Sequence, residues 1–341
     1  CNSIISKNYL RFLVDNNETM VSILCTAYNH EKYIRQCLDG FVMQKTNFKF
    51  EVIVHDDAST DNTANIIREY ENKYPDIIKP IYQKENQYSK GVSLSKIMCA
   101  KCRGKYVAFC EGDDFWTDEL KLQKQVDALE NNTESKCCVC TVRDVDEDGT
   151  SLNLTHPSVP FESSAIDIEG FLKLAISEYA FQTSSYMFLK EDYYEYIINP
   201  PQFRKVSPVG DWPMLLYFCT KGNIYYINGE MSCYRRNAVG SYTTTMGVAT
   251  VEKRKKYNQG LIDMINTFDK YTDYKYHNYC EQFSERFVKY YYDCLKEERN
   301  FKEIVNKKYR KFFKEESSKD RLYIKLKVYL PFVANLYDKK V

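Results

Sequence analysis

The chain has 341 residues, of which 44% are hydrophobic and 28% charged, and its formal net charge at pH 7 is +1. This composition excludes a disordered or fibrous protein, and the balanced charge gives no reason to expect a nucleic-acid partner. The charge is uneven, because residues 301–341 contain twelve Lys or Arg against five Asp or Glu and carry +7.

No apolar run approaches the roughly 20 residues that span a bilayer, and the N-terminal residues lack the pattern of a signal peptide. The chain contains thirteen cysteines. In a chain of this length without an export signal we expect them to be reduced thiols, and therefore we expect a cytoplasmic protein. Two CxxC pairs, Cys99/Cys102 and Cys137/Cys140, lie further apart than the roughly 15–20 residues usual in zinc sites. We therefore expect buried thiols at these positions and no zinc.

The first 145 residues alternate between the hydrophobic periods of strands and helices. The predicted strands cover residues 21–29, 50–57, 76–83, 104–110 and 136–145. The predicted helices between them cover residues 31–44, 63–74, 93–102 and 118–132, the last capped by Thr117 or Asp118. This alternation indicates an α/β fold with a mostly parallel, Rossmann-like sheet flanked by helices. Ligands are then expected outside the carboxyl ends of the strands.

The pattern after residue 150 is less regular. It predicts a strand over 181–190, a helix over 210–222 that ends at Gly222, and a β-hairpin around Asn228-Gly229. From Val251 onward every segment has helical spacing.

Polar residues gather where three of the predicted strands end. They are Thr26, Ala27, Tyr28 and Asn29 after the first strand, Asp56 and Asp57 after the second, and Glu111, Asp113 and Asp114 after the fourth. Turn and helix-cap preferences explain Ser, Thr and Asp in the loops, but not adjacent aspartates at the end of an apolar strand. Such an aspartate can accept hydrogen bonds from a base or a sugar, and a tyrosine ring offers a face for stacking.

The sequence contains neither of the glycine-rich loops that bind dinucleotides or nucleoside triphosphates. Bound phosphates would need another source of positive charge. A divalent cation on Glu111 and Asp113 would supply it, because hard oxygen ligands suit Mg²⁺ or Mn²⁺.

The segments VSILCTAYNHEKYI, EVIVHDDASTDNT and GKYVAFCEGDDFWTDELKLQKQ together resemble the catalytic domain of glycosyltransferase family 2, of the GT-A type. The resemblance extends over residues 19–242. It implies an inverting, metal-dependent hexosyl or N-acetylhexosaminyl transfer from a nucleotide diphosphate, most often UDP, to a glycan or lipid-linked acceptor. We therefore expect a catalytic domain over 1–245, with a nucleotide-binding half at 20–145 and an acceptor half at 146–245, and a helical extension over 246–341.

The resemblance also implies roles for individual residues. The nucleotide contacts would be Thr26, Ala27, Tyr28 and Glu31, and Asp57 would bind the uracil. Glu111-Gly112-Asp113 takes the place of the DXD motif, with Asp113 as the metal ligand and Asp114 facing the sugar. Glu111 stands where Asp is usual, and its longer arm can reach the ribose or a metal-bound water.

Further along the chain, Asp211 in SPVGDWPML resembles the family's catalytic base. Alternatively it caps a helix, because Asp before Trp-Pro is a good helix start. Arg235 and Arg236 match a stretch that faces the diphosphate, or they are solvated arginines on a hairpin edge. Trp116 either lines the sugar pocket or anchors its turn, and no role is assigned to the histidines near the strand ends.

Two other functions are possible. A nucleotidyltransferase would need a glycine- and arginine-rich phosphate loop, which the sequence lacks, and a non-catalytic sugar-nucleotide-binding or scaffold protein would not need Asp57, Asp113 and Asp211. The basic, aromatic C-terminal tail either lies on anionic lipids, which would hold the enzyme at the inner face of the plasma membrane, or packs as a helical cap with its lysines in water. We prefer the second of these readings.

Overall fold

The computed structural model describes residues 18–238 and 249–332. They form two compact units. The first contains the residues up to Pro201 and those from Met214 to the end of the first described range, and the second contains Gln202–Pro213 and the residues from 249 on.

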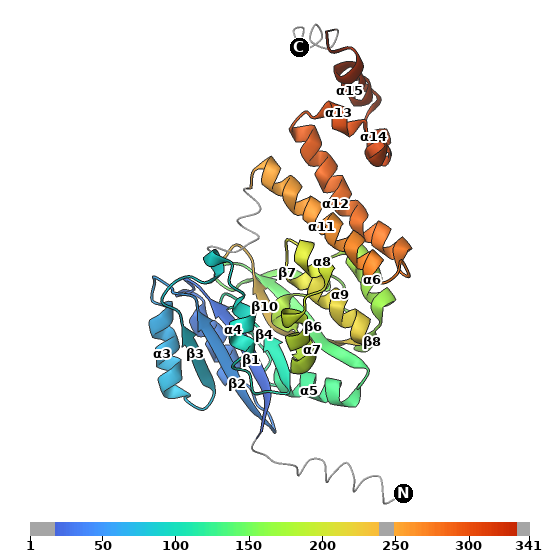
Figure 1. The fold of residues 1–341 in the computed structure, drawn as a ribbon. Helices are drawn as coiled ribbons and strands as arrows, with labels where there is room; N and C mark the ends of the chain where they lie inside the picture. The colour runs from blue at the N-terminus through green and yellow to red at the C-terminus, as the bar shows by residue number, and fades with distance from the viewer. Residues whose placement is uncertain (1–17, 239–248, 333–341) are drawn as a thin grey trace, which may run out of the picture. The chain divides into compact units, whose positions relative to one another are not determined.

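The first unit is built on one ten-stranded mixed sheet in the order β3-β2-β1-β4-β9-β6-β10-β5, with β7 paired to β6 and β8 to β10. The strands are β1 (Thr19–Ala27), β2 (Lys49–Asp56), β3 (Ile78–Tyr82), β4 (Tyr106–Phe109), β5 (Phe115–Trp116), β6 (Ser135–Val145), β7 (Ser151–His156), β8 (Ser164–Ile166), β9 (Met187–Leu189) and β10 (Asn223–Arg235). Figure 1 shows β3, β2, β1 and β4 side by side.

Helices connect these strands. Those of the first unit are α2 (Ile34–Val42), α3 (Thr63–Lys73), α4 (Leu94–Cys99), α5 (Lys121–Asn131), α6 (Ile168–Ser177) and α7 (Lys190–Ile198). Helix α9 (Asp211–Lys221) has its first three residues in the second unit and the rest in the first. The helices of the second unit are α8 (Gln202–Val206), α11 (Val251–Tyr271), α12 (His277–Glu297), α13 (Phe301–Ile304), α14 (Arg310–Glu315) and α15 (Ser318–Tyr329).

The parallel strands predicted from the sequence are present. β3, β2, β1 and β4 pair in parallel, and β1, β2 and β4 bury residues on both faces of the sheet. Val52 and Val54 of β2 belong to the same core as helices α2 and α3. Helix α2 has no side-chain cap, so its buried apolar residues hold it in place, at about 1.5–3 kcal/mol for each large side chain.

The direction of the strands decides which ends meet. β9 pairs antiparallel with both β4 and β6, and β10 pairs in parallel with β6. Strands β6 and β10 therefore run in the same direction as β1, β2 and β4, and the carboxyl ends of all five point to one edge of the sheet.

The predicted hairpin around Asn228-Gly229 is wrong. β10 continues through these residues as one strand of 13 residues, and the register with β6 shifts between Ile227 and Glu230 and again before Ser232. The Asn-Gly pair lies in an irregular part of the strand and does not form a turn, because β6 provides a pairing partner along the whole length of β10. Helix α5 begins at Lys121, later than predicted, and its N-cap residue Leu120 makes no side-chain cap hydrogen bond. Asp118, one of the two predicted caps, accepts the N–H of Leu120 at 2.8 Å in the turn before the helix.

The second unit is helical, as predicted for the residues after Val251. Helices α11 and α12, of 21 residues each, lie side by side (Figure 1). Phe203 of α8 packs edge-on against Phe268, and Trp212 packs against Phe283. None of the helices in the described ranges is both long and apolar enough to cross a bilayer.

Candidate functional site

Three strand ends meet at the carboxyl edge of the sheet, as the sequence predicts. The backbone N–H of Gly112 donates to the carbonyl of Thr26 at 2.9 Å, and that of Asp57 donates to Ala27 at 3.0 Å. These two bonds bring the loops after β2 and β4 onto the end of β1. The polar residues of all three segments therefore form one cluster.

The loops after β1 and β2 are joined by side chains that bond backbone groups of the other loop. Asn29 Oδ1 accepts the N–H of Thr60 at 2.8 Å, and Asp61 Oδ2 accepts that of Glu31 at 3.0 Å. Glu31 Oε2 in turn accepts the N–H of Asn62 at 2.9 Å. Glu31, predicted as a nucleotide contact, therefore also orders the loop that leads into α3.

Asp57 is buried, and its carboxylate is already bonded. Its two oxygens accept the backbone N–H groups of Gln87 and Tyr88 at 2.8 and 3.0 Å. A carboxylate has about four acceptor positions, so Asp57 retains the capacity to accept an N–H from a base. Tyr28, on the neighbouring strand end, is 44% exposed and offers its ring to solvent.

Ala58, directly after Asp57, has a backbone φ of +63°. This left-handed conformation costs an L-residue about 1–2 kcal/mol, whereas glycine adopts it freely at an entropic cost of about 0.5–1 kcal/mol. The strain is tolerated because the hydrogen bonds between the two loops fix the turn.

We expect Ala58→Gly to raise the free energy of unfolding by about 0.5–1 kcal/mol, because relief of the strain exceeds the added entropy of the unfolded chain. Urea denaturation followed by circular dichroism measures the change. Ala128→Gly, within helix α5, is the matched control and should lower the free energy by about 1 kcal/mol. Equal destabilisation by both changes would contradict a strained Ala58.

The turn after β4 requires glycine at its centre. A Cβ atom on Gly112 would lie 2.8 Å from His30 Nδ1 and 3.1 Å from the carbonyl oxygen of Thr26. The turn therefore packs against the end of β1 without space for a side chain. Glu111 and Asp113, on either side, remain partly exposed.

Asp114 lies deeper in the protein than is expected of a residue that faces a sugar. It is 3% exposed, and its Oδ1 accepts the backbone N–H of Arg235 at 2.8 Å. Burial, and then the neighbouring carboxylates of Asp113 and Glu111, raise the pKa of Asp114 well above its ordinary value. This carboxylate links the turn to β10.

Arg235 also differs from the expectation, which places it against a diphosphate. Its side chain is buried and donates to the carbonyls of Asp113 at 2.9 Å and Glu147 at 2.6 Å, and to Gln36 Oε1 at 2.7 Å. The guanidinium also lies over the ring of Tyr33. Arg235 thus joins the segments that contain Asp113, Glu147 and Gln36, because it supplies the hydrogen-bond donors that their buried oxygens need.

Arg236 lies beside a buried acid. Its Nε donates to Asp144 Oδ2 at 2.7 Å, and His156 Nε2 is 3.0 Å from Asp144 Oδ1. Burial opposes ionisation of Asp144, but His156 and Arg236 outweigh it and hold the pKa of this carboxyl below its ordinary value. About a third of the Arg236 side chain stays exposed, so this residue, unlike Arg235, can still face a ligand.

Trp116 anchors the turn. It is 2% exposed, its indole N–H donates to the carbonyl of Ser184 at 2.9 Å, and its ring contacts Phe41. The buried Lys121 places its ammonium 4.0 Å from the Trp116 ring centroid, which is a cation–π contact. These partners leave Trp116 no part in lining a sugar pocket.

The carboxylates after β4 fit a divalent cation that is shared with a substrate. Across residues 18–238 and 249–332, no group of three or more His, Cys, Asp or Glu is arranged to hold a metal by itself. Mg²⁺ and Mn²⁺ commonly bind one or two carboxylates together with substrate phosphates. The partly exposed Asp113, with Glu111 nearby, supplies that donor set.

Asp211 is the first residue of α9, and its Oδ1 accepts the N–H of Trp212 at 2.7 Å. The strand ends belong to the first unit and Asp211 to the second, so its part in the site remains a prediction.

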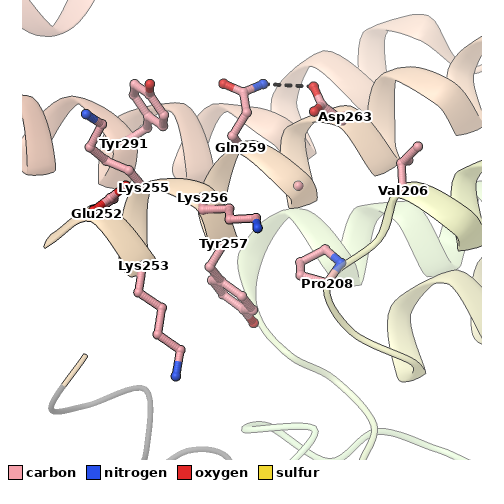
Figure 2. A pocket seen from close by; sticks show the side chains of 11 residues that line it. Val206, Pro208, Glu252, Lys253, Lys255, Lys256, Tyr257, Gln259, Asp263 and Tyr291 are labelled. Atoms are coloured by element: carbon pink, nitrogen blue, oxygen red, sulfur yellow. Dashed lines mark hydrogen bonds between the residues drawn. The ribbon is translucent and has the colours of Figure 1, made fainter. Parts of the chain in front are cut away.

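A hollow of about 640 Å³ lies along helix α11 within the second unit (Figure 2). None of the predicted site residues lines it. Lys255, one of its three lysines, is paired with Glu298 at 2.6 Å. The hollow is therefore not evidence that the strand-end cluster is a binding site.

Residues 22–197, just over half of the chain, match the family model "Glycosyl transferase family 2". An uncharacterized protein of Mycobacterium tuberculosis is 37% identical over 221 residues, which cover 64% of this chain and 60% of that protein. A putative teichuronic acid biosynthesis glycosyltransferase of Bacillus subtilis is 34% identical over 114 residues, 33% of this chain and 43% of that enzyme. The chain thus spans about 60% of the length of its mycobacterial relative.

Solved structures show the same fold. Staphylococcus aureus TarS 1-349 in complex with UDP-GlcNAc has a TM-score of 0.53 at 13% identity, over 80% of this chain and 90% of that one. A Pyrobaculum calidifontis mannosyltransferase in complex with GDP-Man and Mn²⁺ has a TM-score of 0.51 at 15% identity, over 96% and 94%. At these identities the likeness concerns the fold alone, which is of the GT-A type. With the matching family model, it shows that the chain belongs to glycosyltransferase family 2.

Proposed function

We propose that the chain is an inverting glycosyltransferase that moves a sugar from a UDP-sugar to a hydroxyl of a glycan or lipid-linked saccharide during polysaccharide biosynthesis. The observation that carries the proposal is the cluster at the carboxyl edge of the sheet. There an exposed tyrosine, a buried aspartate and a carboxylate-rich turn come from three adjacent strand ends. The family match, and a relative named for teichuronic acid biosynthesis, support it.

The nucleotide would bind across the ends of β1 and β2. The ring of Tyr28 stacks on the base, and Asp57, which its bonds to the backbone of Gln87 and Tyr88 hold in place, accepts the N–H of the uracil. The carbonyl of Thr26 fixes the turn after β4, and the carbonyl of Ala27 accepts the backbone N–H of Asp57. The base site is therefore rigid before the donor arrives, which reduces the ordering cost of binding.

The diphosphate would extend toward the turn after β4. Asp113 would hold a divalent cation, with Glu111 beside it, and Arg236 is the arginine left exposed to meet a phosphate oxygen. When bound, the cation neutralises the charge of the departing UDP diphosphate. We expect Asp211, from the family resemblance, to take the proton of the acceptor hydroxyl while the hydroxyl oxygen attacks the anomeric carbon from the face opposite the leaving UDP.

Binding of the nucleotide tests the proposal. We expect UDP with Mn²⁺ to raise the melting temperature by mass action, and Tyr28→Ala to weaken binding about 10–100-fold through the loss of a stacked base. Tyr194→Ala on α7 removes a ring that is 50% exposed and should bind UDP as the parent does. Titration by thermal shift measures each affinity.

The reaction product separates the alternative functions. Incubation with a panel of UDP-sugars and saccharide acceptors should release UDP in step with transferred sugar. Release of pyrophosphate would assign a nucleotidyltransferase. UDP binding that Tyr28→Ala leaves unchanged would overturn the placement of the base at this strand end.

A further inference from the structure

The last helix of the described chain, α15, buries one of its residues, Ile324. Large apolar side chains are exposed along it and just after it: Leu322 is 60% exposed, Tyr329 68% and Leu330 55%. These three side chains lie within nine residues of one another, and apolar side chains that gather into a contiguous exposed patch mark interaction surfaces.

Four of the exposed side chains share one face of the helix. At 3.6 residues per turn, Lys319, Leu322, Lys325 and Tyr329 fall within about a third of the helix circumference, and Ile324 points to the opposite side. We call these four residues together with Leu330 the α15 face. Ile324 packs with Tyr292, Leu295, Ile304, Tyr309 and Phe312 in a small core. The α15 face is therefore not needed to hold the helix in place.

The charge around the α15 face is strongly positive. Residues 301–332 contain ten Lys or Arg and four Asp or Glu. One of these acids, Glu316, is paired with Lys296. Within the described part of the chain, neither Lys319 nor Lys325 has a carboxylate partner. The face thus combines unpaired cations with exposed apolar side chains.

We infer that the α15 face docks on an anionic lipid surface, in place of the helical cap with solvated lysines that the sequence alone favours. Its apolar side chains enter the boundary between headgroups and acyl chains, and Lys319 and Lys325 extend to the lipid phosphates. On this helix face lysine side chains alternate with apolar side chains. Such a face suits a fluid anionic surface, because each basic residue near the lipids adds to the electrostatic attraction between helix and membrane. The helix lies on the bilayer and does not cross it, and the docking is independent of the proposed reaction.

Co-sedimentation of the full chain with vesicles tests this. The chain should bind vesicles of phosphatidylglycerol and phosphatidylcholine, bind vesicles of phosphatidylcholine alone at least about tenfold more weakly, and lose affinity as salt rises. Lys319→Glu with Lys325→Glu should weaken binding to the anionic vesicles at least about tenfold. The charge-matched control, Lys96→Glu with Lys101→Glu, alters exposed lysines of the first unit and should bind as the parent does.

The apolar residues distinguish a membrane from an acidic protein. Leu322→Ser with Tyr329→Ser should also weaken binding to anionic vesicles, while circular dichroism stays unchanged because both side chains are exposed. Equal loss in the Lys96/Lys101 control would overturn the proposal. So would an unchanged affinity of the serine variant together with equally tight binding to polyglutamate, because that result assigns the face to an acidic partner.

Discussion

Replacement of Asp113 by asparagine is expected to lower the rate of sugar transfer by about 10²–10³-fold or more and to leave the fold intact. The side chain is partly exposed, and the structural bond of this residue is made by its backbone carbonyl, which accepts Arg235 Nε. Asparagine keeps that carbonyl and the size of the side chain but removes the charge that a divalent cation requires. Turnover is measured as UDP released with saturating donor and Mn²⁺.

A second measurement separates loss of the cation from loss of the fold. In the parent, Mn²⁺ should tighten UDP binding, and in Asp113→Asn the affinity should be the same with and without Mn²⁺. Asp76→Asn is the matched control, because Asp76 is exposed and precedes β3 at the opposite edge of the sheet. Transfer by Asp113→Asn at the parental rate, or equal loss in the control, would remove Asp113 from the metal site.

The strand ends could be predicted from the sequence because two patterns coincide there. Apolar runs with helices between them require a parallel sheet, and the polar residues follow the runs directly. The second half of the sheet could not be predicted in the same way. Asn228-Gly229 is a strong hairpin signal, yet β6 pairs with β10 on both sides of it, and nothing local in the sequence reveals that distant partner.

The partners of the site residues are less accessible to sequence analysis. Asp57 is bonded to the backbone N–H groups of Gln87 and Tyr88, and Arg235 to the carbonyls of Asp113 and Glu147. Every residue type except proline carries both backbone groups, so no motif marks these contacts. The sequence therefore predicts a phosphate contact for Arg235, because a guanidinium suits a phosphate. The structure shows instead that Arg235 is a buried link between segments.

Asp144 could have been found from the sequence. It is an acid near the end of an apolar strand, the same signal that singles out Asp57, and it holds Arg236 and His156 at the same edge of the sheet. The signal is weaker here because Arg143 precedes it, which makes the end of the strand resemble a solvated terminus.

Asp211→Asn is expected to lower the rate of transfer by about 10²–10⁴-fold, the usual contribution of a general base, with little change in UDP affinity or in stability. Asparagine and aspartate are about equally good at a helix start, and an asparagine oxygen can still accept the Trp212 N–H that Asp211 Oδ1 accepts now. The substitution therefore removes proton acceptance while it preserves the start of α9. Single-turnover transfer and the melting temperature are measured on the same sample.

The matched control is Asp167→Asn, because Asp167 caps α6 by accepting the N–H of Gly170 at 2.8 Å. If Asp211 is only a cap, both variants transfer sugar at the parental rate. If it is the base, only Asp211→Asn is slow, and its rate loses the dependence on pH that ionisation of a general base gives the parent. A slow Asp211 variant that keeps the parental pH profile would place the missing base elsewhere.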